Sequence, residues 1–176
     1  MKKTFILASV LSAFALTGIA SAQTGSGTLG VTATVAGSIN LTFVTDSSGL
    51  AVTGTGTSTA SLPFGTVSMY AGSVPANVTK TIHGTTSFDL STPFDIQVDL
   101  ANSASTTYTL TATLATADAV NIWSIGATDI SSAAAFALTS AGEFGSAVPY
   151  TLKINVPASE AAGLITNSIG FTAVGA

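Results

Sequence analysis

The sequence predicts an all-β fold, an antiparallel β-sandwich, and three observations carry that prediction. Apolar and polar residues alternate along most of the chain, which is the pattern of strands with one buried face. Threonine fills many of the polar positions, and its branched side chain suits a pleated sheet. Roughly eight such stretches follow one another at near-regular spacing with turn residues between them, as in an antiparallel sandwich.

The predicted strands are of two grades, and two short helices interrupt them. The clearest alternation runs through residues 29–35, 39–43, 94–100, 108–114, 150–156 and 165–173. Weaker strand candidates are residues 62–70, 77–83 and 120–125. Residues 131–139 are rich in alanine and predict a short helix, and residues 159–163 predict a single helical turn that ends at Gly163.

The first 22 residues have the three parts of a secretory signal peptide. Met1-Lys2-Lys3 is a short positive start, residues 5–16 are apolar, and Ala20-Ser21-Ala22 is a small-residue cleavage site before Gln23. The apolar run has twelve residues, below the ~20 needed to span a bilayer. We therefore expect residues 1–22 to be removed and residues 23–176 to form one exported β-sandwich domain, which is extracellular, on the cell surface or in the periplasm.

The composition of residues 23–176 excludes some partners. Two lysines stand against eight carboxylates, which gives a net charge of −6, and there is no arginine. Nucleic acids and anionic membrane surfaces bind basic patches, so we expect neither as a partner, and we expect no membrane span after cleavage. Cysteine is absent, so export brings no disulfide and the domain relies on its core or on partners.

No set of residues has the pattern of an active site or a cofactor site. His83 is the only histidine and no Gly-x-Ser-x-Gly turn is present, while zinc sites need several His or Cys ligands. Asp95 and Asp99 share one strand face, but their Cα atoms would lie roughly 13 Å apart and no calcium-loop motif surrounds them. We predict no catalytic residues, no metal and no cofactor, and expect that the protein is not an enzyme.

Two stretches resemble exported bacterial β-sandwich proteins of the fimbrial-subunit and spore-coat-protein-U type. The first is residues 29–43 together with Leu-Pro-Phe-Gly-Thr-Val at 62–67, and the second is residues 150–173, with a Val-Pro-Ala turn inside a closing hairpin. The resemblance implies an immunoglobulin-like or pilin-like sandwich. Many chaperone-usher subunits carry a disulfide, which this chain cannot form, and the assembly route is therefore left open.

The resemblance also implies self-assembly by donor-strand complementation, in which an extended segment of one subunit completes the sheet of another. Residues 27–36 are the candidate donor strand, because they are uncharged and follow the loose segment 23–27. Its assembly side chains would be Leu29, Val31, Ala33 and Val35. The other interpretation makes the same residues the first strand of the chain's own sheet.

These features predict a secreted structural subunit of a fibre, pilus, coat or biofilm matrix, whose partner is another copy or another surface subunit. One alternative is a secreted module that binds carbohydrate or another ligand, suggested by Trp123 and by the Asp95 and Asp99 face. A further alternative is a small outer-membrane barrel, although the chain ends Val174-Gly175-Ala176 without the terminal aromatic residue of such barrels.

Overall fold

The structure is a computed structural model that describes residues 29–176. The predicted signal peptide, its cleavage site and the first two residues of the candidate donor strand lie outside the described residues. Contacts divide the chain between Thr34 and Val35, and the fold below is that of the unit Val35–Ala176. This unit consists of strands and contains no helix.

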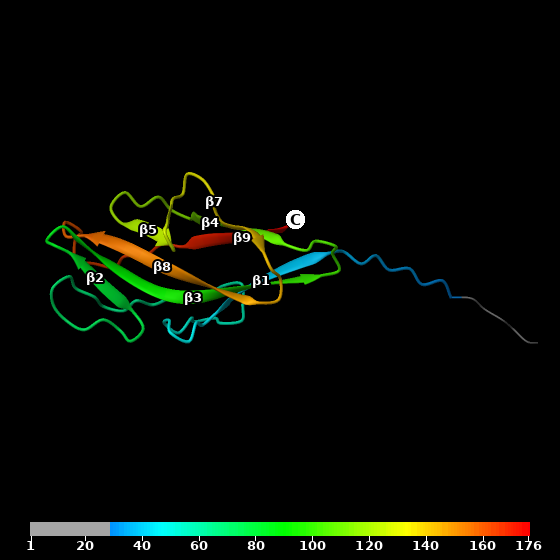
Figure 1. Ribbon diagram of the computed structural model, residues 1–176, viewed down its shortest axis with the longest axis horizontal. Helices are drawn as coiled ribbons and strands as arrows, with labels where there is room; N and C mark the ends of the chain where they lie inside the picture. Colours follow the sequence, from blue (N-terminus) through cyan, green and yellow to red (C-terminus); the bar gives the residue numbers. More distant parts are fainter. Residues whose placement is uncertain (1–28) are drawn as a thin grey trace, which may run out of the picture. The chain divides into compact units, whose positions relative to one another are not determined.

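Two antiparallel sheets make up the fold (Figure 1). The larger sheet has the order β1-β3-β8-β5-β6, with β2 also paired to β3, and the smaller has the order β7-β4-β9. The strands are β1 (Ser38–Val44), β2 (Thr79–His83), β3 (Ser87–Ala101), β4 (Tyr108–Leu114), β5 (Ile122–Ile125), β6 (Thr128–Ile130), β7 (Phe136–Gly142), β8 (Ala147–Pro157) and β9 (Ile169–Gly175).

The long central strand β3 organises the larger sheet. On one side it pairs with β8 from Ser87↔Pro157 to Gln97↔Ala147. On the other side β1 pairs with its second half and β2 with its first. Thr92 lies where these two partners meet and is fully buried. Its hydroxyl accepts the Leu50 N–H at 2.8 Å and donates to the Asn77 carbonyl at 2.9 Å, so one side chain links two parts of the connection between β1 and β2.

Alternating side chains from both sheets form one core. In β3 every second residue from Phe88 to Val98 is buried, and β4 and β8 follow the same period. The fully buried large side chains include Ile96 and Val98 of β3, and Tyr108 and Leu110 of β4. The prediction of an all-β fold with antiparallel sheets is confirmed, because the period-two pattern buries one face of each long strand.

Several element predictions were wrong in detail. Residues 131–139, predicted as a helix, contain the start of β7, where pairing with β4 overrides the helical preference of the alanines. Residues 159–163 form a turn and irregular chain, and residues 62–70 are irregular. The structure assigns no strand to residues 29–37, and β1 begins at Ser38.

Candidate functional site

A large concave feature of the described residues is an apolar groove of about 1200 Å³ between the two sheets. Residues of β3 and β8 form its floor, β1 and β9 stand at its sides, and two irregular segments, residues 58–67 and 163–168, complete its lining. Its main apolar side chains are Leu41, Phe43, Leu62, Phe64, Phe88, Leu90, Phe94, Trp123, Leu152, Ile154, Val156, Ile165, Ile169 and Phe171. None of the residues that line it is charged.

The floor follows from the sheet period. Phe88, Leu90 and Phe94 of β3 point inward beside Leu152 and Ile154 of β8, because facing positions of an antiparallel pair share a side. These floor residues are at most 8 % exposed. The lining side chains from β1, β9 and the two irregular segments are only partly buried. The groove therefore leaves part of the hydrophobic core open to solvent.

An aromatic cluster connects the two sheets at the groove. The ring of Phe171 on β9 meets Phe43 on β1 edge-on, with ring centroids 5.4 Å apart, and meets Phe94 on β3 at 6.0 Å. Phe94 in turn lies 6.3 Å from Tyr150. Tilted and edge-on aromatic pairs of this kind are favourable beyond simple burial, so the cluster fixes β9 against the larger sheet.

Strand β9 presents an open edge at this groove. Within residues 35–176 it has a hydrogen-bonded neighbour on one side only, where it pairs with β4 from Leu114↔Ile169 to Tyr108↔Gly175. Ile169, Phe171 and Ala173 pack toward the core, while Gly170, Thr172 and Val174 are exposed. An edge strand carries unpaired N–H and C=O groups and is a template for another strand.

The four candidate donor residues lie in an extended apolar segment outside the strands. Residues 29–37 have no strand assignment. Leu29 is 87 % exposed, Val31 80 % and Val35 69 %, and Ala33 is exposed as well. Burial of these three large apolar side chains would lower the free energy of the system. Which sheet it completes, that of its own chain or that of a neighbour, stays a prediction.

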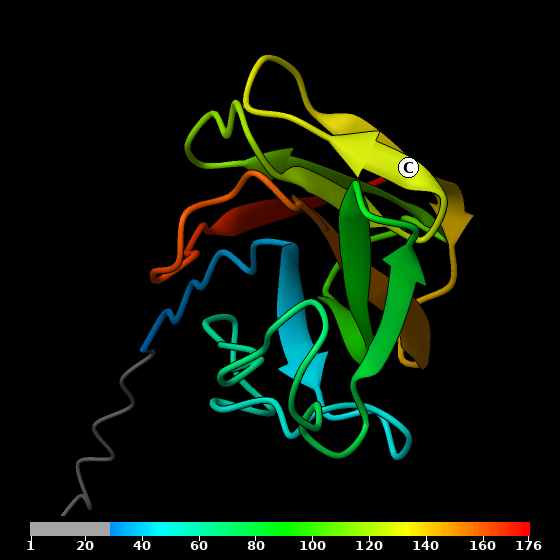
Figure 2. The same ribbon diagram turned by 90° about the vertical axis from the view of Figure 1, so that its left-hand side faces the viewer.

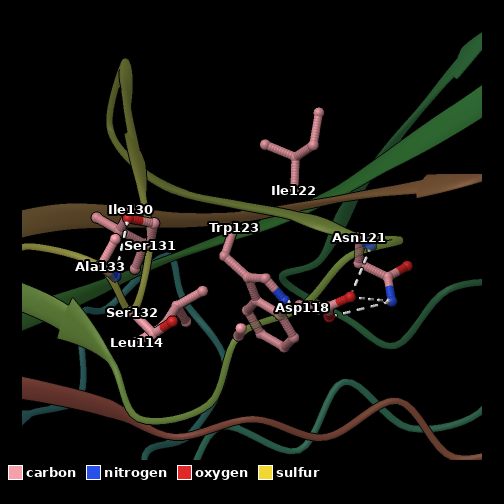
Figure 3. A pocket seen from close by; sticks show the side chains of 10 residues that line it. Leu114, Asp118, Asn121, Ile122, Trp123, Ile130, Ser131, Ser132 and Ala133 are labelled. Atoms are coloured by element: carbon pink, nitrogen blue, oxygen red, sulfur yellow. Dashed lines mark hydrogen bonds between the residues drawn. The ribbon is translucent and has the colours of Figure 1, made fainter.

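A second, smaller cavity of about 370 Å³ lies beside Trp123 and was not foreseen from the sequence (Figure 3). The Asp118 carboxylate accepts the indole Nε1–H of Trp123 at 2.8 Å and the backbone N–H groups of Asn121 and Val120 at 2.8 and 3.0 Å. Burial raises the pKa of Asp118, but these hydrogen bonds outweigh it and lower that pKa to about 2. No sequence motif predicts this cluster, because its contacts depend on the conformation of the turn before β5.

Trp123 and the aspartates that suggested ligand binding do not gather at one place. Trp123 is 5 % exposed, so it does not offer a ring face for stacking on a sugar. Asp99 accepts a hydrogen bond from Gln97. Burial and the neighbouring Asp46 raise the pKa of Asp95. Across residues 29–176 no three His, Asp or Glu side chains come together as metal ligands would.

His83 contacts a carboxylate on the outer face of the larger sheet. Its Nε2 lies 3.0 Å from Oδ2 of Asp89, whose Oδ1 accepts from Asn155 Nδ2 at 2.6 Å. Burial opposes ionisation of Asp89, yet the hydrogen bonds from Asn155 and His83 lower its pKa overall. The nearby Ser87 hydroxyl accepts from the same Asn155 amide at 3.2 Å, so the polar groups form a cross-strand network between β2, β3 and β8.

Comparison with protein-family models, with curated proteins and with solved structures finds no match to this chain. In the part of the chain that the structure describes, no helix has the length and apolar character needed to cross a bilayer.

Proposed function

We propose that the protein is an exported structural subunit of a fibre, pilus, coat or matrix, and that copies join by strand complementation. In this proposal residues 29–35 of one copy enter the groove of another and pair with the open edge of β9. The observation that carries the proposal is that one chain holds both halves of such a joint. Within the described residues it has an apolar groove beside an unpaired strand edge, and an exposed alternating segment.

The two halves match in chemistry. Neither residues 23–37 nor the groove lining carries a charged side chain, so the joint would desolvate no ion. Burying Leu29, Val31 and Val35, with a smaller share from Ala33, would contribute roughly 5–8 kcal/mol, at about 1.5–3 kcal/mol for each large side chain. Backbone hydrogen bonds to β9 would add affinity and set the register of the added strand.

The size of the groove supports a peptide segment as its occupant. Pockets for small molecules usually measure about 300–1,000 Å³, and this groove is larger, at about 1200 Å³. Its lining comes from four strands, β1, β3, β8 and β9. An extended segment contacts several strands in that way, whereas a compact ligand would need convergent polar groups, which the floor lacks.

The experiment compares two single-charge variants of the mature chain, residues 23–176. Val31→Asp places a carboxylate on the side of the segment that would face the groove, and Thr32→Asp places the same charge on the opposite side, because neighbouring residues of a strand point to opposite faces. We expect the unmodified chain and Thr32→Asp to form concentration-dependent polymers in electron microscopy and light scattering, and Val31→Asp to remain monomeric. A monomeric unmodified chain, or equal behaviour of the two variants, would overturn the proposal.

A further inference from the structure

Residues 60–67, here called the strap, line the groove and pack against the core. Ala60, Leu62 and Phe64 are half-buried and pack against the core, while Ser61 and Pro63 between them are exposed. Val67 packs against the same core after a break at Gly65. Residues 60–64 of the strap therefore turn every second side chain toward the core, as a strand would do.

The strap nevertheless is not a strand. Among the described residues, its only backbone pairing with a neighbouring segment is the isolated bridge Thr53↔Ser61, where each residue donates its N–H to the other's carbonyl. In the described chain, residues 62–67 take part in no backbone–backbone hydrogen bond. Pro63 has no N–H to donate, and Gly65 has φ of +68°, which interrupts an extended run. Figure 2 shows the long connection between β1 and β2, which includes the strap, as irregular chain.

A segment held by side-chain packing alone opens at lower cost than one held in a hydrogen-bonded sheet. The residues after Ser61 would lose apolar contacts on leaving the groove but no backbone hydrogen bonds within the described chain. A strand paired with β9 would make both kinds of contact. The difference favours replacement of the strap by such a strand.

We propose that the strap is an exchangeable wall of the groove, which packs against the core in the free subunit and moves away when residues 29–35 of a second copy enter. This inference rests on the proposed function and adds that assembly is an exchange of one segment for another. It gives a role to the Leu-Pro-Phe-Gly stretch at residues 62–65, which belongs to no strand. It also makes release of the strap a step that limits the rate of assembly.

The test measures how fast a synthetic peptide of residues 27–36 binds to the mature Val31→Asp chain, whose own donor segment is disabled. Trp123 is the only tryptophan and lines the groove, so its emission reports entry of the peptide, and anisotropy of a labelled peptide gives a second signal. Phe64→Ala removes the largest contact of the strap. Tyr70→Ala is the matched control, because Tyr70 follows the strap and is 69 % exposed. We expect Phe64→Ala to bind about tenfold faster, which corresponds to about 1.4 kcal/mol, and Tyr70→Ala to leave the rate unchanged.

A second variant locks the strap without removing a core side chain. Thr53 and Ser61 exchange both backbone hydrogen bonds, and the Cα atoms of such a pair lie about 5.5 Å apart, within the range of a disulfide. The chain has no cysteine, so Thr53→Cys with Ser61→Cys would form a single disulfide. We expect oxidation to slow peptide binding about tenfold or more and reduction to restore it, by the same conversion. Circular dichroism verifies that each variant is folded.

The outcomes separate the two proposals. Peptide binding at the same rate in Phe64→Ala, in the oxidised pair and in the parent chain would overturn the exchange of the strap and leave strand complementation standing. Absence of peptide binding in every folded variant would overturn strand complementation, and the exchange with it. A faster Phe64→Ala variant together with a slower oxidised pair supports both.

Discussion

Two stretches of this chain carry the same alternating pattern and have opposite surroundings. In residues 94–100 of β3, Phe94, Ile96 and Val98 are at most 3 % exposed, and the strand pairs with β1 and β8. In residues 29–35, Leu29 and Val31 are at least 80 % exposed and no strand forms. Alternation therefore indicates that a segment can cover an apolar surface. It does not indicate which surface the segment covers.

The most severe test of this comparison removes one apolar side chain from each stretch. Phe94→Ala should lower the free energy of unfolding by about 3–5 kcal/mol, because the ring packs among Phe43, Tyr150 and Phe171. Leu29→Ala should change it by less than about 0.5 kcal/mol, as exposed substitutions do. Urea unfolding of a monomeric chain of residues 23–176 measures both. Similar losses in the two variants would mean that residues 29–35 are as much a part of the fold as β3.

A smaller loss of stability should follow from removing the Thr92 hydroxyl, which links two parts of the connection between β1 and β2. Thr92→Val keeps the shape but leaves the Leu50 N–H and the Asn77 carbonyl without their buried partner. We expect a loss of about 1–3 kcal/mol, the cost of unsatisfied buried polar groups. The control is Thr81→Val on β2, whose side chain is exposed, and it should be nearly neutral. A loss no larger than that of the control would show that these hydrogen bonds do not stabilise the connection.

The Asp118 cluster should contribute stability that depends on pH. Asp118→Asn weakens the acceptor for the Trp123 and backbone N–H groups, so we expect a loss of about 1–2 kcal/mol at pH 7. The folded-state pKa of about 2 lies below the ordinary value of 3.8. The advantage of the native residue is therefore complete above about pH 4 and is lost as the pH falls toward 2. Urea titrations at pH 7, 4 and 2 measure this trend, and a difference that is independent of pH would contradict it.

A substitution of Asp95 on the outer face of β3 should give the smallest change in stability, and it should stabilise the fold. Burial and then the nearby Asp46 carboxylate raise the pKa of Asp95, so its ionised form is disfavoured in the folded chain. Asp95→Asn should raise the stability at pH 7 by no more than about 0.5 kcal/mol. The gain should disappear as the pH falls below the ordinary carboxyl value of 3.8, where both states are protonated. Thermal unfolding at pH 7 and pH 3 measures the sign, and destabilisation at pH 7 would refute it.

The sequence was most informative where one residue in two is large and apolar. Strands β3, β4 and β8 were predicted because their alternation persists over seven residues or more. Residues 131–139 were wrongly predicted as a helix because small residues satisfy helical and extended patterns alike, and only the pairing of residues 136–139 with β4 decides between them. The strap has the alternation of a strand, yet Pro63 and Gly65 prevent regular pairing.

The candidate site could be predicted only in part. Leu29, Val31, Ala33 and Val35 were predicted as candidate donor residues from the resemblance and from their uncharged, alternating pattern, and their donor role stays a prediction. The groove could not be predicted, because its floor and sides come from strands far apart in the sequence. The Asp118 cluster depends on how one turn folds, and a single sequence carries no signal for that.

The pairing of β1 with β3 has a mechanical consequence. The two strands run antiparallel over seven residues, from Ser38↔Ala101 to Val44↔Asp95. The bonds of such a ladder lie across the strands, so a pull along β1 from Ser38 would load them together in shear instead of opening them one by one. In a polymer joined through residues 29–35, tension would enter the domain at that point. Tensile strength would then come from the length of this ladder, in a chain that has no cysteine with which to cross-link itself.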